Sequence, residues 1–94
     1  MKVAFTRTAA AELDEILAYT ATNFPYRTVA LADRIDAAIA RISRWPESAH
    51  IVEVRAGMRM VPILRFPFKI FYRLNGDVVE IVHIHHASRN WPDT

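Results

Sequence analysis

The chain has 94 residues, of which 52% are hydrophobic and 23% charged, so it is long enough for one domain and too apolar to be disordered. It has no cysteine, which excludes disulfides and thiolate chemistry. The net charge is +2, but five basic residues and no acid lie between Glu53 and Asp77, which favours an acidic partner, either protein or nucleic acid. With no signal-peptide pattern and no apolar run long enough to span a bilayer, we expect a single cytoplasmic domain, residues 1–94, that does not enter a membrane.

The first half of the chain predicts a strand and two helices. Lys2–Phe5 is rich in β-forming residues and predicts the strand. Thr8 is the expected N-cap of the first helix, which should end near Asn23 because Pro25 disfavours helical geometry in the residue before it. A second helix is expected from about Pro25 to Arg44, antiparallel to the first because the connection is short. Its apolar stripe consists of Leu31, Ile35, Ala38, Ile39 and Ile42.

The second half changes to the two-residue period of strands. The strand-like segments are Ile51–Arg55, Arg59–Leu64, Phe68–Leu74 and Val78–His85. Pro62 places its segment on a sheet edge or in irregular structure, and Asn75-Gly76-Asp77 predicts a tight hairpin turn. The expected fold class is therefore α+β: an N-terminal strand, a two-helix antiparallel hairpin and a three-stranded antiparallel meander (βααβββ), with the helices packed on one face of a small twisted sheet.

Strand alternation also sorts the side chains of the last hairpin into two faces. In the first of its strands, Ile70 and Tyr72 belong to the core face, with Phe68 and Leu74, whereas the opposite, open face carries Lys69, Phe71 and Arg73. In the last strand we assign Val82 and Ile84 to the core, and His83 and His85 to the open face. A bulge near His85 and His86 would reverse the residues that follow it.

The histidines allow several interpretations. His83 and His85 could face one ion, but zinc needs three or four ligands and Glu80 alternates to the other face, so the sequence predicts no metal site and no cofactor. The same face has the residue types for metal-free RNA cleavage, because histidine can act as acid or base and Arg59, Lys69 and Arg73 are cations. Hydrogen-bonded histidines at a sheet edge would show the same pattern.

An arginine stripe follows the second helix. Arg27, Arg34 and Arg41 are seven residues apart, and none has an acid three or four positions away. Such a stripe suits bidentate pairing with the carboxylates or phosphates of a partner. Alternatively, these are solvated arginines paired with Glu12 or Glu15 on the first helix.

Taken together, these features resemble the RelE/ParE superfamily, the small toxins of bacterial type II toxin–antitoxin systems. The resemblance covers nearly the whole chain, and the residues that carry it are Arg59, Phe66-Pro67, Phe71-Tyr72-Arg73, Val79-Glu80-Ile81 and His86-Ala87-Ser88-Arg89-Asn90. The last of these is similar to the His-x-x-Arg-Asp ending of the ParE branch, with Asn90 in place of the aspartate.

The resemblance implies a growth-arresting toxin that a cognate antitoxin neutralises by direct binding through an acidic, partly disordered segment. The pair would form a hetero-oligomer that reaches operator DNA only through the antitoxin. ParE-like members imply inhibition of DNA gyrase and plasmid stabilisation without enzymatic activity, whereas RelE-like members imply ribosome-dependent, metal-independent cleavage of mRNA. Trp91 stands where the nucleases often carry tyrosine, and indole has no ionisable hydroxyl, so we favour the ParE branch. A third possibility is an inactive toxin that only binds its antitoxin.

Three sets of residues follow from these alternatives. For the target-binding surface we expect Arg59, His83, His85, His86, Arg89 and Trp91. For antitoxin binding we expect Arg27, Arg34, Arg41, Arg65, Lys69 and Arg73. No catalytic residue is assigned for a gyrase inhibitor, but a nuclease would use Lys69, Arg73, His86 and Arg89.

Overall fold

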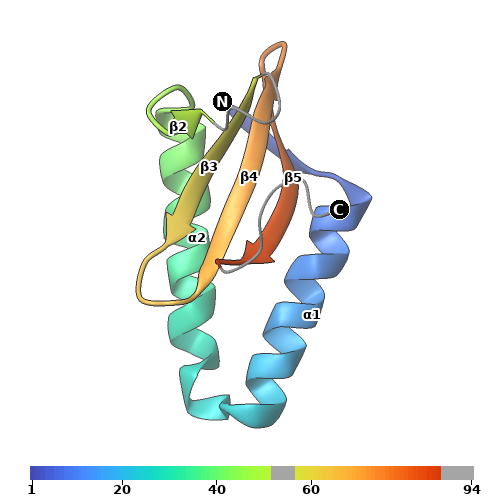
Figure 1. Cartoon of the computed structure of the whole chain (residues 1–94), viewed down its shortest axis with the longest axis vertical. Coiled ribbons are helices and arrows are strands. Elements are labelled where there is room, and N and C mark those ends of the chain that lie inside the picture. Colours follow the sequence, from blue (N-terminus) through green and yellow to red (C-terminus); the bar gives the residue numbers. More distant parts are fainter. Residues whose placement is uncertain (52–56, 88–94) are drawn as a thin grey trace.

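The computed structural model describes residues 1–51 and 57–87, which form one mixed sheet covered by two helices (Figure 1). The elements in chain order are β1 (Lys2–Phe5), α1 (Arg7–Asn23), the 3-10 turn η1 (Pro25–Arg27), α2 (Thr28–Arg44), β2 (His50–Ile51), β3 (Met58–Ile63), β4 (Phe68–Asn75) and β5 (Val78–His86). The expected α+β class is confirmed. Within the described ranges, neither helix has the length and apolar character needed to cross a membrane.

The sheet has the strand order β1-β5-β4-β3-β2. Strands β3, β4 and β5 form the predicted antiparallel meander, and β1 pairs in parallel with β5 from Lys2 opposite Val78 to Phe5 opposite Ile81. The short β2 pairs antiparallel with β3. The predicted segment Ile51–Arg55 starts within β2, and its residues 52–56 lie outside the described part of the chain.

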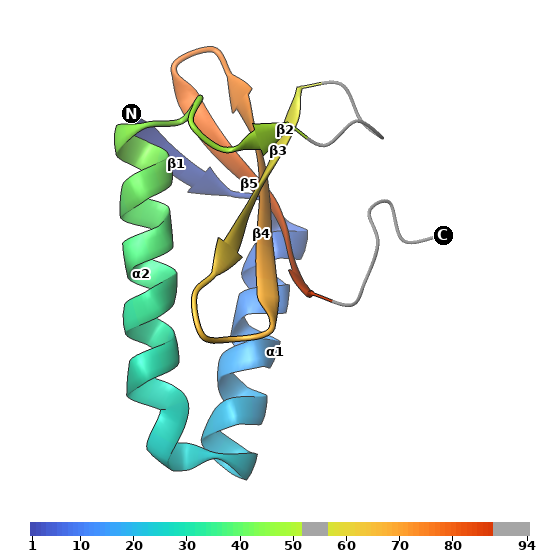
Figure 2. The same cartoon turned by 60° about the vertical axis from the view of Figure 1, so that its left-hand side comes forward.

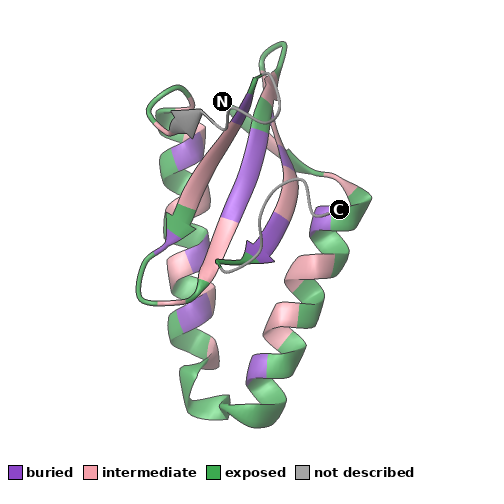
Figure 3. Ribbon diagram, in the orientation of Figure 1, coloured by how far each residue is buried: buried purple, intermediate pink, exposed green. Residues whose placement is uncertain are grey.

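Both helices lie on the same side of the sheet, as Figures 1 and 2 show together. The core between helices and sheet contains Ala9, Leu31, Ile35, Ile42, Ile63, Ile70, Tyr72, Val79, Ile81 and Ile84. The predicted stripe of α2 is confirmed, because three of its members are buried and Ala38 and Ile39 pack against them. Figure 3 shows buried residues on both helices and in the central strands.

The start of α1 differs from the prediction. Thr6, and not Thr8, is the N-cap: its Oγ1 accepts a hydrogen bond from the Ala9 N–H at 3.1 Å. Thr6 also donates its hydroxyl to the Val82 carbonyl at 3.1 Å and its N–H to the Ile81 carbonyl at 2.9 Å. The chain therefore passes from β1 into α1 while Thr6 is still bonded to β5. This tertiary contact places the N-cap two residues before the predicted Thr8.

The predicted ends of the two helices are confirmed at Asn23 and Arg44, although Pro25 begins a 3-10 turn and α2 itself starts at Thr28. The hairpin turn is also confirmed: Asn75 pairs with Val78, which leaves Gly76 and Asp77 as the turn. Gly76 has φ 64°, a left-handed conformation that glycine adopts without steric cost.

A bulge in β5 changes which side chains face the core. Phe71 pairs with His83 and Tyr72 with Ile81, so Val82 has no residue opposite it. Ile84 is buried in the core as predicted, but the prediction for Val82 is wrong, because the extra residue breaks the alternation. The same bulge puts Glu80 on the open face with His83, contrary to strict alternation.

Pro62 lies where the sequence predicts, on an edge. It pairs with Lys69 of β4, whereas the two residues of β2 pair with Met60 and Arg59. Within the described residues, the stretch of β3 around Pro62 therefore has a strand on one side only. Val61 and Pro62 on this stretch of β3 line a hollow that Ala37 and Ala38 of α2 also line.

Candidate functional site

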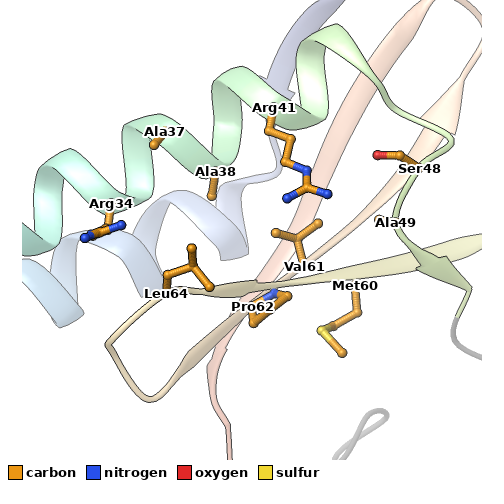
Figure 4. A pocket seen from close by; sticks show the side chains of 10 residues that line it. All are labelled: Arg34, Ala37, Ala38, Arg41, Ser48, Ala49, Met60, Val61, Pro62 and Leu64. Atoms are coloured by element: carbon orange, nitrogen blue, oxygen red, sulfur yellow. The ribbon is translucent and has the colours of Figure 1, made fainter.

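A groove of about 490 Å³ lies between α2 and β3 (Figure 4). We call it the α2–β3 groove; it is lined by Arg34, Ala37, Ala38, Arg41, Ser48, Ala49, Met60, Val61, Pro62 and Leu64. The two arginines come from α2, two turns apart, and the Arg41 side chain extends from the helix towards Val61. An apolar floor with two guanidinium groups at its rim suits a chain segment that is both apolar and acidic.

The groove exists because α2 presents small side chains to β3. Ala37 and Ala38 have short side chains and so leave space between the helix and β3, and Ser48 and Ala49 close one end of the groove. Hydrogen bonds from β3 hold this closing loop in place. Arg59 Nη1 donates hydrogen bonds to the carbonyls of Glu47 and Ala49, each at 3.0 Å.

The Tyr72 hydroxyl, which lies in the core, also holds this loop, because it donates a hydrogen bond to the Pro46 carbonyl. Its side chain is fully buried. Burial raises the pKa of Tyr72 above its ordinary value, an effect that the positive charges of Arg59 and Arg41 partly offset. Tyr72 thus remains a neutral hydrogen-bond donor under ordinary conditions.

A second hollow, of about 610 Å³, lies between α1, η1 and the beginning of β4. We call it the α1–β4 hollow; it is lined by Glu15, Ile16, Tyr19, Thr20, Phe24, Arg27, Phe66, Pro67, Phe68 and His86. Arg27 stacks 4.6 Å above the ring of Phe66 and reaches the Arg65 carbonyl at 3.5 Å. Tyr19 is 62% exposed and Phe24 44%, so aromatic surface is available for a partner here.

Many side chains on the open face of the sheet contact one another. Arg73 forms an ion pair with Glu80 at 2.6 Å, and Lys69 lies opposite His85. Phe71 and His85 are both buried, with ring centroids 5.7 Å apart. Much of the basic and aromatic character expected on this face is therefore engaged within the chain.

His83 and His85 lie beside Glu12 of α1. His83 Nδ1 is 3.1 Å from Glu12 Oε1, and His85 Nε2 is 3.1 Å from Glu12 Oε2. The two ring nitrogens are 3.0 Å apart. Glu12 Oε1 also accepts the Ile84 N–H at 3.0 Å, which ties α1 to the part of β5 beyond its pairing with β1. These contacts place His83 and His85 in a cluster with a carboxylate.

The structure does not bring the predicted nuclease residues together. Lys69 and Arg73 lie on the open face, whereas His86 pairs with Phe68 on the helix side and lines the α1–β4 hollow. The predicted target-binding set is only partly brought together: His83 and His85 are adjacent, whereas His86 lines the α1–β4 hollow. Arg59 lies in β3 and bonds to the loop before β2. Arg89 and Trp91 lie outside the described residues.

The predicted antitoxin-binding residues fall into three groups. Arg34 and Arg41 share the α2–β3 groove, and Arg27 reaches Arg65 beside the α1–β4 hollow. Lys69 and Arg73 are on the opposite side of the sheet. The stripe of three arginines is therefore divided between two hollows.

Glu12 is not among the site residues that the sequence predicts. A signal was present, because Glu12 follows Ala9 by three positions and precedes Ile16 by four, within the stripe of α1 that packs on the core. An acid in such a stripe needs a polar partner. Here the partners are the two histidines and a backbone amide of β5.

Comparisons with known proteins agree with the family expected from the residues. The family described as "ParE toxin of type II toxin-antitoxin system, parDE" matches residues 3–91. A Sinorhizobium fredii protein named "Putative toxin Y4kP" is 30% identical over 91 residues, covering 97% of this chain and 93% of that one.

Two solved structures share the fold. "Chromosomal ParDE TA system from P. aeruginosa" superposes with a TM-score of 0.80 at 23% identity, covering 94% of this chain and 97% of that chain. "YoeB/ParE toxin from Agrobacterium tumefaciens" gives 0.65 at 15% identity, covering 92% and 98%. With the family match over residues 3–91, the conclusion is that the chain belongs to the ParE toxin family of type II toxin–antitoxin systems.

Proposed function

We propose that a cognate antitoxin neutralises this toxin by placing an acidic, partly disordered segment in the α2–β3 groove. The arrangement of Arg34 and Arg41 above an apolar floor supports this proposal. Such a segment would pair its carboxylates with the two guanidinium groups and bury its apolar side chains against Val61 and Leu64, becoming ordered as it binds. The complex would be a hetero-oligomer that contacts operator DNA only through the antitoxin.

The groove is tested by reversing its charge. Arg34→Glu combined with Arg41→Glu should weaken antitoxin binding by on the order of tenfold or more and reduce its salt dependence. Arg44→Glu is the matched control, because Arg44 is on the same helix but stacks on Trp45, outside the groove lining. Equal affinities for the double variant and the control would place the antitoxin elsewhere.

We also propose that the toxin acts in the bacterial cytoplasm by inhibiting DNA gyrase, which would arrest growth and, on a plasmid, favour its retention. The observation that carries this choice is the separation of Lys69 and Arg73 from His86 on opposite faces of the sheet. Metal-independent RNA cleavage needs an acid–base group and cations around one phosphate. Family membership supports the same choice.

mRNA cleavage on the ribosome is the alternative, because Lys69, Arg73 and His83 do share the open face. One preparation of purified toxin distinguishes the two activities. A gyrase inhibitor should block supercoiling while leaving mRNA intact in a translating extract. Unchanged supercoiling at toxin levels that arrest growth would reject gyrase as the target. mRNA cleavage that Lys69→Ala abolishes would then select the nuclease.

A toxin that has lost its activity is distinguished by induction in cells. Antitoxin binding at ordinary affinity without growth arrest would support that alternative. Arrest that co-expressed antitoxin relieves would reject it.

A further inference from the structure

We propose that Glu12, His83 and His85 form a binding site for a divalent transition-metal ion, specifically Zn²⁺. The three side chains offer Glu12 Oε2, His83 Nδ1 and His85 Nε2, and these ligand atoms lie within 4.8 Å of one another. Two imidazoles and one carboxylate are typical zinc ligands, and three protein ligands leave a further coordination position open. Neither the gyrase nor the antitoxin proposal requires this site.

The three ligand atoms form a nearly equilateral triangle. Its sides are 3.0 Å between the ring nitrogens, 3.1 Å from His85 to Glu12 Oε2 and 3.2 Å from His83 to the same oxygen. Ligands about 2.1 Å from a zinc ion are roughly 3.0–3.4 Å apart in octahedral or tetrahedral arrangements. An ion about 1.1 Å above this triangle would lie about 2.1 Å from all three atoms, so the distances between the ligand atoms already suit zinc.

Without an ion, hydrogens on the ring nitrogens can link the three side chains, because His83 Nδ1 and His85 Nε2 each lie 3.1 Å from an oxygen of Glu12. Each ring nitrogen carries at most one hydrogen, and that hydrogen occupies the lone pair that a metal ion needs. A zinc ion above the triangle would replace these hydrogens and be bound by all three ligand atoms at once.

The surroundings orient the ligands. The Ile84 N–H holds Glu12 Oε1 at 3.0 Å, which leaves Oε2 directed at the histidines. Supporting hydrogen bonds of this kind fix ligand geometry in metal sites. The bulge at Val82 contributes as well, because it sets the register in which His83 and His85 both lie on the open face.

The position of the site determines how an ion could enter it and which elements the bound ion would connect. The His85 side chain is 3% exposed, but those of His83 and Glu12 are 24% and 20% exposed, so an ion can enter from their side. Because Glu12 belongs to α1 and the histidines to β5, a bound ion would fasten α1 to the strand. Zinc should therefore stabilise the folded toxin as well as bind to it.

Calorimetric titration of Zn²⁺ into the untagged toxin tests the proposal, with the toxin either free or bound to its antitoxin. Co²⁺ serves as a spectroscopic probe of the same site. We expect one ion per chain, a higher unfolding midpoint with zinc that a chelator reverses, and visible Co²⁺ absorption bands. Absence of stoichiometric zinc binding by the wild-type free toxin would overturn the proposal.

The variants are chosen to keep the fold. Glu12→Gln retains an oxygen that can accept the Ile84 N–H but removes the anionic ligand, and His83→Ala truncates a partly exposed side chain. Each should weaken zinc binding by at least about tenfold. His86→Ala is the control, since His86 follows on the same strand but faces the helix side. The assignment is wrong if either ligand variant binds zinc with wild-type affinity while circular dichroism shows a native fold. Loss of zinc binding in His86→Ala would also contradict it.

Discussion

Replacing Tyr72 with phenylalanine removes one buried hydroxyl and leaves the aromatic ring in place. The hydroxyl donates to the Pro46 carbonyl and so holds the loop that ends the α2–β3 groove. A net contribution of roughly 0.5–1.5 kcal/mol is usual for such a bond. We therefore expect Tyr72→Phe to lower the free energy of unfolding by about 1 kcal/mol near neutral pH, which corresponds to a midpoint about 4–8 °C lower for a domain of this size.

The same variant should remove a pH dependence. In the folded chain burial raises the pKa of Tyr72 above its ordinary value of 10.0. The folded state therefore keeps the phenolic proton longer than the unfolded state. Its stabilising contribution is present in full below the unfolded pKa and is lost as the pH rises through the folded pKa. The advantage of the wild type over Tyr72→Phe should consequently shrink in alkaline solution.

Urea unfolding between about pH 7 and about pH 11 measures both effects, because all other ionisable groups are common to the two proteins and their contributions cancel in the difference. Tyr26→Phe is the matched control, since Tyr26 is 82% exposed. If Tyr72→Phe unfolds at the wild-type urea concentration at neutral pH, the hydroxyl makes no net contribution to stability and its bond to Pro46 does not have the expected strength. A stability difference that stays constant through the alkaline range would contradict the expected pH dependence.

Three further substitutions test the fold by urea unfolding at neutral pH. Leu31→Ala should cost about 2–5 kcal/mol, because a fully buried side chain is truncated; a loss below about 1 kcal/mol would contradict its place in the core. Thr6→Ala should cost about 1–2 kcal/mol through its lost cap and its lost bond to Val82, and Thr6→Ser should restore most of that. Arg73→Ala should change stability by less than about 0.5 kcal/mol, since Arg73 is 51% exposed in its pair with Glu80; a loss above about 2 kcal/mol would show a stronger bond.

Local patterns predicted most of the secondary structure. The stripe of α2 followed from apolar periodicity and the end of α1 from the position of Pro25, because both signals act within a few residues. The β4–β5 hairpin followed from Gly76 and its neighbours for the same reason. The parallel pairing of β1 with β5 joins residues far apart in the chain, and no local pattern encodes it.

The candidate sites were less predictable, because they depend on register and on contacts between elements. Strict alternation placed Val82 in the core and Glu80 away from His83, and one extra residue in the bulge reversed both. The association of Glu12 with His83 and His85 depends on how α1 crosses the end of β5. The arginine stripe was visible in the sequence, but its division between two hollows follows from the way α2 packs on β3 and from the turn η1.

The pairing of β1 with β5 has a consequence for when the chain can fold during its synthesis. The hydroxyl of Thr6, where α1 begins, bonds to a residue 76 positions later, in the last described strand. During synthesis, β1 and the start of α1 therefore have no strand to bond to until β5 has left the ribosome. Proteins rich in contacts of such long sequence separation fold slowly. A nascent chain that stops before Val78 would lack the strand that pairs with β1, so this fold can form only after β5 has been synthesised.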